Sequence, residues 1–471
     1  MLNKTKIICT IGTQSENEST LEQMLLAGMN VARLNFSNGD VSTQQRYVEK
    51  IRKLSLIHGR PISIMLDTCG PKVLADTFEN DVVSVGKGCK VTIYTNSTVV
   101  GNSSMFSIKY PSIVNEVKEG DVILANAGQL KLLVLKVDKR SKKLECVTQN
   151  SGNLVSHCLI NIPHVKTSLP ILSGDDIANL KFAINMDVDF IAASFVRDVD
   201  DVLQIKKYLE DQNSNIKVYA KIENAIALEN FDEILNVADG IVIPRGDLSN
   251  EVSLELLPIV QKKMIRKCND AGKPVIVGTQ ILSSMTRNKK PSRAEVADVA
   301  NLVLDGVDAL SLSNVTTVGL YPIKSVKMLA KILTATEEHA DELSHYNRID
   351  AYTKDKNLNE AVALSVKETA KSVDAKLIVA FSESGATAKR ISMLRPNCAI
   401  ASISSDDSVR KSLALFWGIY PVVSNHPTFE ADFVSKASEI ATYYGLKEGD
   451  TFIITGGNGV GNTNFMKVCK L

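Results

Sequence analysis

Charged side chains recur at the ends of short apolar runs along the chain, and their types favour phosphoryl chemistry. Lys221 and Glu223 end one such run, and Asp247 follows the next. Two carboxylates on neighbouring strands can share a cation, and a site with only oxygen ligands fits Mg²⁺ or Mn²⁺ better than zinc. Arg33 and Lys221 supply the positive charge that a phosphoryl group requires during transfer. These residues predict metal-assisted phosphoryl transfer.

The same strand ends contain no histidine. A Ser-His-Asp hydrolase and a histidine proton shuttle both need one, so neither class is expected. The competing interpretation is that the charges only tie the rim of the fold together through ion pairs. That would be ordinary for any single residue, but the convergence of the whole set favours a site.

The elements that would position these residues form a regular series. Eight short β-rich runs are separated by helical stretches, and most are apolar throughout, which is typical of strands covered on both faces. Eight alternating β and α units predict a closed parallel (β/α)₈ barrel (a TIM barrel), whose active site lies at the C-terminal ends of the strands. The predicted strands are Lys6–Gly12, Asn30–Phe36, Ser63–Thr68, Phe190–Phe195, Lys217–Glu223, Gly240–Gly246, Val275–Ile281 and Ala309–Val315.

The series is interrupted once and later ends, which predicts three domains. The catalytic barrel is expected from residues 1–70 and 168–340. Residues 71–167 contain short β-like pieces separated by turn residues, which predicts a small β-barrel lid domain inserted in a βα loop. Residues 341–471 are expected to form a C-terminal α/β domain with an open sheet. Its predicted strands are Lys376–Phe381, Ala399–Ile403, Ile419–Val423 and Thr451–Thr455.

The composition restricts the partners and the compartment. Lys and Arg number 54 against 53 Asp and Glu, so no nucleic-acid or anionic membrane partner is expected. No apolar stretch approaches the roughly 18 residues of a spanning helix, and no secretory signal is recognisable. The eight cysteines are scattered without a Cys-x-x-Cys pair, which predicts free thiols and a cytoplasmic location.

The segment Ala220-Lys221-Ile222-Glu223-Asn224 resembles the signature of the pyruvate kinase family. The similarity runs from Lys4 to near the end of the chain. Other family motifs match in order and spacing, namely Ala32–Ser37, Leu66–Thr68, Pro244–Leu248, Gly278–Gln280, Lys289–Glu295 and Asp298–Asn301. The resemblance implies transfer of a phosphoryl group from phosphoenolpyruvate to ADP, giving pyruvate and ATP. It also implies a lid, a C-terminal regulatory domain and a homotetramer.

The resemblance assigns a role to each matching residue. Lys221 would contact the phosphoryl group in flight and Arg33 would steady it, while Glu223 and Asp247 would hold the divalent metal. The backbone amides of Gly246 and Asp247 would hold the pyruvate carboxylate.

Two further residues are implied in proton transfer. Thr279 would lie beside the carbon that takes up a proton, and Ser313 would belong to the proton relay.

A monovalent-cation site is implied at Asn35, Ser37, Asp67 and Thr68. Lys72 replaces a glutamate that is common in potassium-dependent members of the family. A tethered ammonium can supply the charge that K⁺ otherwise brings, so we expect K⁺ to be dispensable. The alternative is that Lys72 is a solvated hinge residue.

Several departures from the family pattern affect the nucleotide end and the lid. Leu74 stands where the family has a phosphate-binding arginine. Asn126-Ala127 replaces two acids, His157-Cys158 replaces two lysines, and Asn314-Val315 interrupts a further motif. Two alternatives to an active pyruvate kinase therefore remain open. One is a catalytically weakened paralogue with a binding or regulatory role, and the other is nucleotide-independent, metal-assisted enolate chemistry on pyruvate or oxaloacetate.

A second anion site is predicted in the C-terminal domain. Ser382, Ser384 and Thr387 lie where a strand is followed by a helix, and backbone amides at a helix N-terminus bind anions. The segment resembles the loop that holds an activating sugar phosphate in regulated pyruvate kinases. The alternative is an ordinary strand-to-helix turn.

Overall fold

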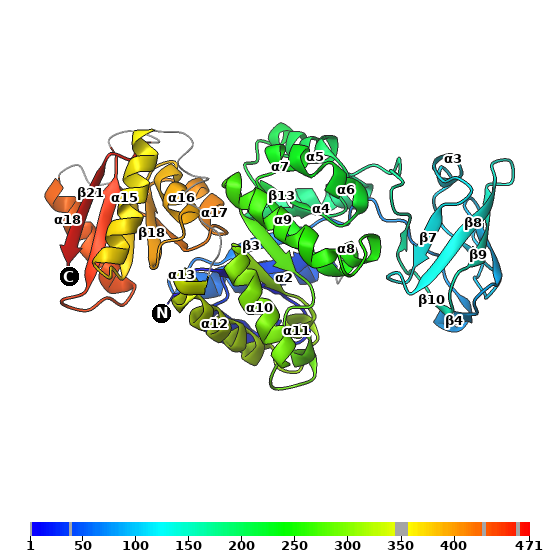
Figure 1. Cartoon of the computed structure of the whole chain (residues 1–471), viewed down its shortest axis with the longest axis horizontal. Coiled ribbons are helices and arrows are strands. Elements are labelled where there is room, and N and C mark those ends of the chain that lie inside the picture. Colours follow the sequence, from blue (N-terminus) through cyan, green and yellow to red (C-terminus); the bar gives the residue numbers. More distant parts are fainter. Residues whose placement is uncertain (1, 37–39, 344–356, 426–429, 458–461) are drawn as a thin grey trace.

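The computed structural model describes residues 2–36, 40–343, 357–425, 430–457 and 462–471. Three parts lie in a row, with the C-terminal domain and the lid on opposite sides of the barrel (Figure 1). No helix among the described residues is long and apolar enough to cross a membrane.

The central part is a closed barrel of eight parallel strands in the order β1-β16-β15-β14-β13-β12-β3-β2. All eight predicted strands are confirmed, but each ends one to three residues before its predicted limit. Thr279 and Ser313 therefore lie just after the ends of β15 and β16, and Gly246 lies in the first turn of the helix that follows β14. The strands are β1 (Lys6–Thr10), β2 (Val31–Asn35), β3 (Ser63–Asp67), β12 (Phe190–Ala193), β13 (Lys217–Lys221), β14 (Gly240–Pro244), β15 (Val275–Gly278) and β16 (Ala309–Leu312).

Several of the helices around the barrel begin at side chains that cap them. Ser173 and Ser292 each form a capping box, with Asp176 and Glu295 respectively, which satisfies backbone N–H groups that a helix start leaves free. The helices are α1 (Glu18–Leu26), α2 (Val41–Ile57), α4 (Gly174–Asn185), α5 (Val199–Asp211), α6 (Ala225–Glu229), α7 (Phe231–Val237), α8 (Arg245–Glu251), α9 (Leu257–Asp270), α10 (Arg293–Asp305), α11 (Asn314–Thr317), α12 (Pro322–Glu338) and α13 (Ala340–Leu343).

The interior of the barrel is filled by side chains from its own strands and by one from the C-terminal domain. Phe190 and Tyr219 pack edge to face with ring centroids 5.4 Å apart. Leu415, which follows a helix of the C-terminal domain, is fully buried in the same cluster. The C-terminal domain therefore closes one end of the barrel core.

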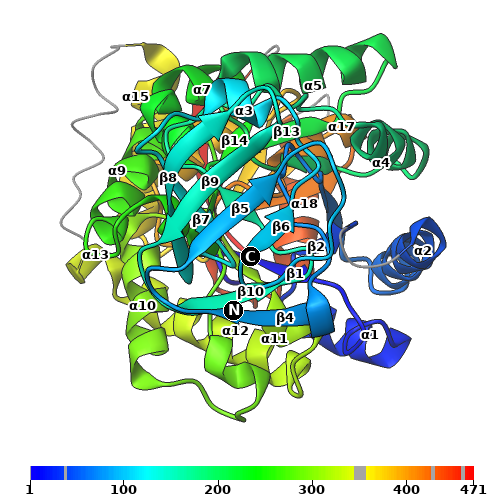
Figure 2. The ribbon, with the colours of Figure 1, turned by 90° about the vertical axis from the view of Figure 1, so that its right-hand side faces the viewer.

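The lid consists of two sheets (Figure 2), and its buried side chains form a core of their own. One sheet has six strands in the order β11-β7-β8-β9-β5-β6, and the other pairs β10 with β4. The elements are η1 (Glu79–Asp81), β4 (Val82–Val85), β5 (Lys90–Tyr94), β6 (Met105–Ser107), α3 (Ile113–Glu116), β7 (Val122–Ala125), β8 (Leu130–Asp138), β9 (Lys143–Thr148), β10 (Gly152–Val155) and β11 (Ile160–Asn161).

The C-terminal domain is an open sheet in the order β19-β18-β17-β20-β21. The four predicted strands are confirmed, and the antiparallel edge strand β21 was not predicted. The elements are α15 (Leu358–Ser372), β17 (Leu377–Phe381), α16 (Ala386–Met393), β18 (Ala399–Ser404), α17 (Asp407–Leu413), β19 (Ile419–Val423), α18 (Glu430–Tyr443), β20 (Thr451–Gly456) and β21 (Phe465–Lys470). The limits of the three domains at residues 70, 168 and 340 stay predictions.

Candidate active site

A chain of buried ion pairs runs across the C-terminal ends of β2, β3 and β13. Arg33 Nη2 lies 2.5 Å from Asp67 Oδ2, and Lys221 Nζ lies 3.1 Å from the same oxygen. Lys221 Nζ also lies 3.0 Å from Glu223 Oε1. The side chains of Lys221 and Glu223 are 9% and 1% exposed, so these charges are largely shielded from water.

The pairing favours the charged forms of Asp67 and Lys221 despite their burial. Burial alone would raise the pKa of Asp67, but Arg33 and Lys221 hold that pKa well below its ordinary value. Burial would lower the pKa of Lys221, yet Asp67 and Glu223 raise it. Two cations therefore face two carboxylates, and the nearby carboxylate of Asp247 brings the formal charge of the group to −1. Such a group attracts a cation.

Glu223 and Asp247 fit the requirements of a divalent metal. Burial raises the pKa of Glu223, and the charge of Asp247 raises it further. The Phe195 N–H donates to Glu223 Oε2 at 2.6 Å and orients this side chain. No cluster of three or more His, Cys, Asp or Glu that could hold a metal occurs in the described part of the chain. Two carboxylates completed by substrate oxygens and water suit Mg²⁺, which keeps much of its hydration shell.

The substrate-binding residues predicted at Gly246 and Thr279 are brought together. The Gly246 N–H donates to Thr279 Oγ1 at 2.7 Å. Thr279 has a φ of 61°, in the left-handed region that β-branched residues rarely adopt. Ser313 accepts from Arg33 Nη1 at 3.3 Å, which links it to the ion-pair chain.

The residues predicted to bind a monovalent cation are partly engaged with other groups. Asp67 pairs with Arg33 and Lys221, and Thr68 Oγ1 accepts from the Ser194 N–H at 2.9 Å. Asn35 ends β2, while Ser37 lies outside the described residues.

Lys72 extends its ammonium towards the rim. Its Nζ lies 5.4 Å from the centroid of the Phe195 ring, whose backbone orients Glu223. A cation is therefore tethered beside Phe195, next to the proposed site.

The departures from the family pattern lie mainly in the lid and its hinge. Leu74 is 42% exposed and pairs with Leu159 in an isolated bridge next to Cys158. Asn126 and Ala127 form a left-handed turn, with φ of 52° and 54°. Burial raises the pKa of the Cys158 thiol, so this cysteine is not activated as a thiolate.

Three residues that contact the site were not predicted. Ser194 Oγ accepts from Lys221 Nζ at 2.8 Å, Thr10 Oγ1 accepts from Arg33 Nη1 at 3.3 Å, and Phe195 binds Glu223 through its backbone. They follow or end the first and fourth barrel strands, where no charged side chain draws attention. Position at a strand end, regardless of charge, is the signal that would have found them.

In the predicted effector loop, much of the hydrogen-bonding capacity is used internally. The Thr387 N–H donates to Ser382 Oγ at 3.2 Å, and the buried Thr387 hydroxyl lies 2.7 Å from that of Thr463. Ser384 is half-buried and precedes Gly385, which has a φ of 75°.

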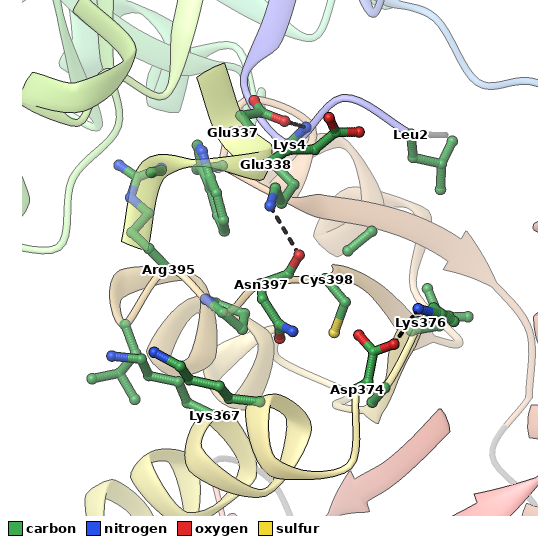
Figure 3. A pocket seen from close by; sticks show the side chains of 18 of the residues that line it. Leu2, Lys4, Glu337, Glu338, Lys367, Asp374, Lys376, Arg395, Asn397 and Cys398 are labelled. Carbon is green, nitrogen blue, oxygen red and sulfur yellow. Dashed lines mark hydrogen bonds and ion pairs between the residues drawn. The ribbon is translucent and has the colours of Figure 1, made fainter. Parts of the chain in front are cut away.

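A cavity of about 870 Å³ lies between the barrel and the C-terminal domain, away from the ion-pair chain (Figure 3). Its charged groups are largely paired. Lys4 Nζ donates to the Asn397 carbonyl at 2.9 Å, and Lys376 pairs with Asp374 at 2.6 Å. The cavity lies at the N-terminal ends of the barrel strands, where Lys4 precedes β1 and Gly306 precedes β16.

Comparison with known proteins agrees with this geometry. Residues 2–326 match the family model described as pyruvate kinase, barrel domain, and residues 360–469 match pyruvate kinase, alpha/beta domain. The chain is 40% identical to a pyruvate kinase of Sporosarcina psychrophila over 474 residues and 41% identical to one of Geobacillus stearothermophilus over 476 residues. Each alignment covers 99% of this chain and 80% of the relative. A crystal structure of a pyruvate kinase from Cryptosporidium parvum superimposes with a TM-score of 0.90 at 33% identity, covering 99% of this chain and 96% of that chain. The chain belongs to the pyruvate kinase family.

Proposed function

We propose that this chain transfers the phosphoryl group of phosphoenolpyruvate to ADP and so forms pyruvate and ATP. The observation that carries the proposal is the position of Lys221, a buried charged ammonium held between Asp67 and Glu223 beside the Arg33 guanidinium. Preorganised cations of this kind stabilise the charge on a phosphoryl group in flight without reorganisation.

In the transfer step, the bond between phosphorus and the bridging oxygen of phosphoenolpyruvate breaks, and the terminal phosphate oxygen of ADP bonds to phosphorus. The electron pair stays on the former bridging oxygen, so an enolate of pyruvate is left. Arg33 and Lys221 offset the charge of the phosphoryl oxygens during this step.

Glu223 and Asp247 are the proposed ligands of Mg²⁺ or Mn²⁺. A bound divalent metal would act as a Lewis acid on oxygens of the substrate. The N–H of Phe195 donates to Glu223 Oε2 at 2.6 Å and so fixes the orientation of this side chain.

The reaction is completed when the methylene carbon of the enolate takes up a proton. Thr279 is proposed to lie beside that carbon, and Ser313 to relay the proton. The backbone amides of Gly246 and Asp247 are proposed to hold the carboxylate. The Gly246 amide now donates to the Thr279 hydroxyl, so the carboxylate would displace or share this bond.

Further properties are proposed from the family resemblance. We propose a homotetramer in the cytoplasm that works without K⁺ because of Lys72. A sugar phosphate is proposed as an effector at Ser382, Ser384 and Thr387. Light scattering tests the tetramer, and titration of the activity with sugar phosphates tests the effector.

One assay tests the proposed function. Purified protein with phosphoenolpyruvate, ADP and Mg²⁺ should form pyruvate, and Lys221→Met should abolish turnover. Lys206→Met is the matched control, since Lys206 also pairs with a carboxylate, Asp239 at 3.0 Å, but lies on α5 outside the site.

The two alternatives give different results in that assay. Leu74 favours a weakened nucleotide end, because it places an uncharged side chain where the family has arginine. No turnover but metal-dependent proton exchange at the pyruvate methyl group would indicate nucleotide-independent enolate chemistry. A protein that shows neither pyruvate formation nor proton exchange would be a paralogue with a binding or regulatory role.

A further inference from the structure

The turn that carries Thr279 has an unfavourable backbone conformation. Thr279, Gln280 and Leu282 have φ values of 61°, 59° and 51°, although none of them is glycine. Left-handed conformations of this kind cost free energy and persist only when the surroundings impose them. Something around the turn must therefore hold it.

The guanidinium of Arg245 holds the first residue of the turn. Its Nη2 donates to the Thr279 carbonyl at 3.1 Å. The same guanidinium forms a two-point ion pair with Asp298, with Nη1 2.7 Å from Oδ1 and Nη2 2.9 Å from Oδ2. The Arg245 side chain is 9% exposed, so the pair is shielded on the arginine side and its geometry is fixed by the fork of the guanidinium.

Helix α8, which begins at Arg245, is linked to the turn a second time next to this contact. Arg245 and Gly246 are consecutive residues of α8, and the Gly246 N–H donates to Thr279 Oγ1 at 2.7 Å. Thr279 is thus bound through its carbonyl and through its hydroxyl. Both torsions that place the hydroxyl, the backbone φ and the side-chain rotamer, are restricted by α8.

Helix α10 supports the turn at both of its ends. Asp298 holds Arg245, and Glu295, three residues earlier on α10, accepts from the N–H and the hydroxyl of Ser284 at 2.7 and 2.5 Å. The start of α10 is fixed by the capping box between Ser292 and Glu295. Two carboxylates that lie three residues apart on α10 therefore hold the segment from Thr279 to Ser284, one through Arg245 and the other through Ser284.

We propose that Arg245 and Asp298, here called the turn clamp, are positioning residues that hold Thr279 for protonation of the enolate. The proposal rests on the proposed function and adds residues that touch neither the phosphoryl group nor the metal ligands. Loosening the turn clamp should slow the proton-transfer step more than it weakens the binding of phosphoenolpyruvate, because a displacement of about 1 Å in a reacting group can cost about a hundredfold in rate.

The test uses the full chain with Asp298→Asn, which keeps the shape of the side chain and removes its charge. We expect kcat for pyruvate formation to fall about 10- to 100-fold, with the KM for phosphoenolpyruvate changed about twofold or less. Metal-dependent deuterium incorporation into the pyruvate methyl group should fall at least as much. The solvent deuterium isotope effect on kcat should rise, since protonation becomes rate-limiting. A merely structural role would not move this isotope effect.

Asp305→Asn is the matched control. Asp305 ends the same helix and also pairs with a cation, Lys262, but it contacts no residue of the turn. Its kcat and isotope effect should equal those of the unaltered chain. Asp298→Glu, which retains the charge, should recover part of the rate. Normal turnover and an unchanged isotope effect in Asp298→Asn would overturn the turn clamp and leave the proposed function intact.

A second readout does not depend on activity. Glycine adopts a φ of +61° without strain, so a chain with Thr279→Gly needs the turn clamp less. Asp298→Asn should lower the midpoint of thermal unfolding by less in the Thr279→Gly chain than in the unaltered chain. Equal shifts of the unfolding midpoint in the two backgrounds would contradict the turn clamp, whether or not the unaltered chain forms pyruvate. A lack of pyruvate formation by the unaltered chain would refute only the proposed function.

Discussion

The ammonium nitrogen of Lys6 lies 3.6 Å from the centroid of the Tyr420 ring, so the first barrel strand meets the C-terminal domain in a buried cation–π contact. The same nitrogen donates to the Ile419 carbonyl at 2.6 Å. Burial lowers the pKa of Lys6 to about 7, against the opposing effects of Glu337 and Asp308. A titratable group with a displaced pKa is therefore part of this interface.

This pKa predicts how stability depends on pH. Between about pH 7 and 10.5 the unfolded chain binds a proton at Lys6 that the folded chain has released, so stability rises with pH across that window. We expect the unfolding midpoint of the unaltered chain to gain more between pH 7.5 and 9.5 than that of Lys6→Met. The same gain in both chains would show that Lys6 titrates normally.

Removal of one proposed metal ligand should weaken metal binding. Glu223→Gln keeps the acceptor oxygen but loses the charge that attracts the cation, and we expect at least about a hundredfold lower apparent affinity for Mn²⁺. Titration of the activity and of Mn²⁺ binding measures this loss. Glu229→Gln serves as the control, because Glu229 is exposed and pairs only with His164 in the described structure. Equal affinity in both variants would remove Glu223 from the metal site.

The chain should be active without K⁺. Lys72 already provides a cation beside Phe195, and Lys72→Glu is expected to lose activity in the absence of K⁺ and to regain part of it when K⁺ is added. The measurement is pyruvate formation in tetramethylammonium and in potassium buffers of equal ionic strength. Strong activation of the unaltered chain by K⁺ would refute the role assigned to Lys72.

Introducing the arginine of the family at the hinge should improve use of the nucleotide. A charge-assisted contact to phosphate contributes about 1.5–3 kcal/mol, so Leu74→Arg is expected to lower the KM for ADP about tenfold or more. Leu74 is 42% exposed, which leaves room for the longer residue. Leu74→Gln separates charge from polarity and should leave that KM nearly unchanged. An unaltered KM in Leu74→Arg would mean that the nucleotide does not reach this hinge.

The convergence of the proposed site residues could be predicted because the strand ends of a closed barrel meet at one rim. Lys221, Glu223 and Arg33 meet for this reason alone. Their partners Ser194 and Thr10 escaped prediction because they carry no charge, and the strain at Thr279 could not be predicted because it depends on Arg245 and Asp298, contacts made across the fold.

Parts of the lid and of the C-terminal domain were harder to predict, because they too depend on contacts between distant parts of the chain. The strand β8 (Leu130–Asp138) alternates buried and exposed side chains over its first half, a pattern that sequence shows directly. Edge strands such as β21 and the two-residue β11 have no such pattern, since their position depends on their pairing partners. The burial of Leu415 within the barrel likewise depends on the docking of a separate domain.

Leu415 has a consequence for how the molecule is made. The last barrel strand ends at Leu312, about one hundred residues before the leucine that closes the apolar interior. During synthesis, a barrel with all eight strands would still expose its apolar interior to water at one end until Leu415 had left the ribosome. The final ordering of the catalytic rim is therefore expected to wait for nearly the whole polypeptide, so a chain truncated after the barrel would be a poor substitute for the complete enzyme.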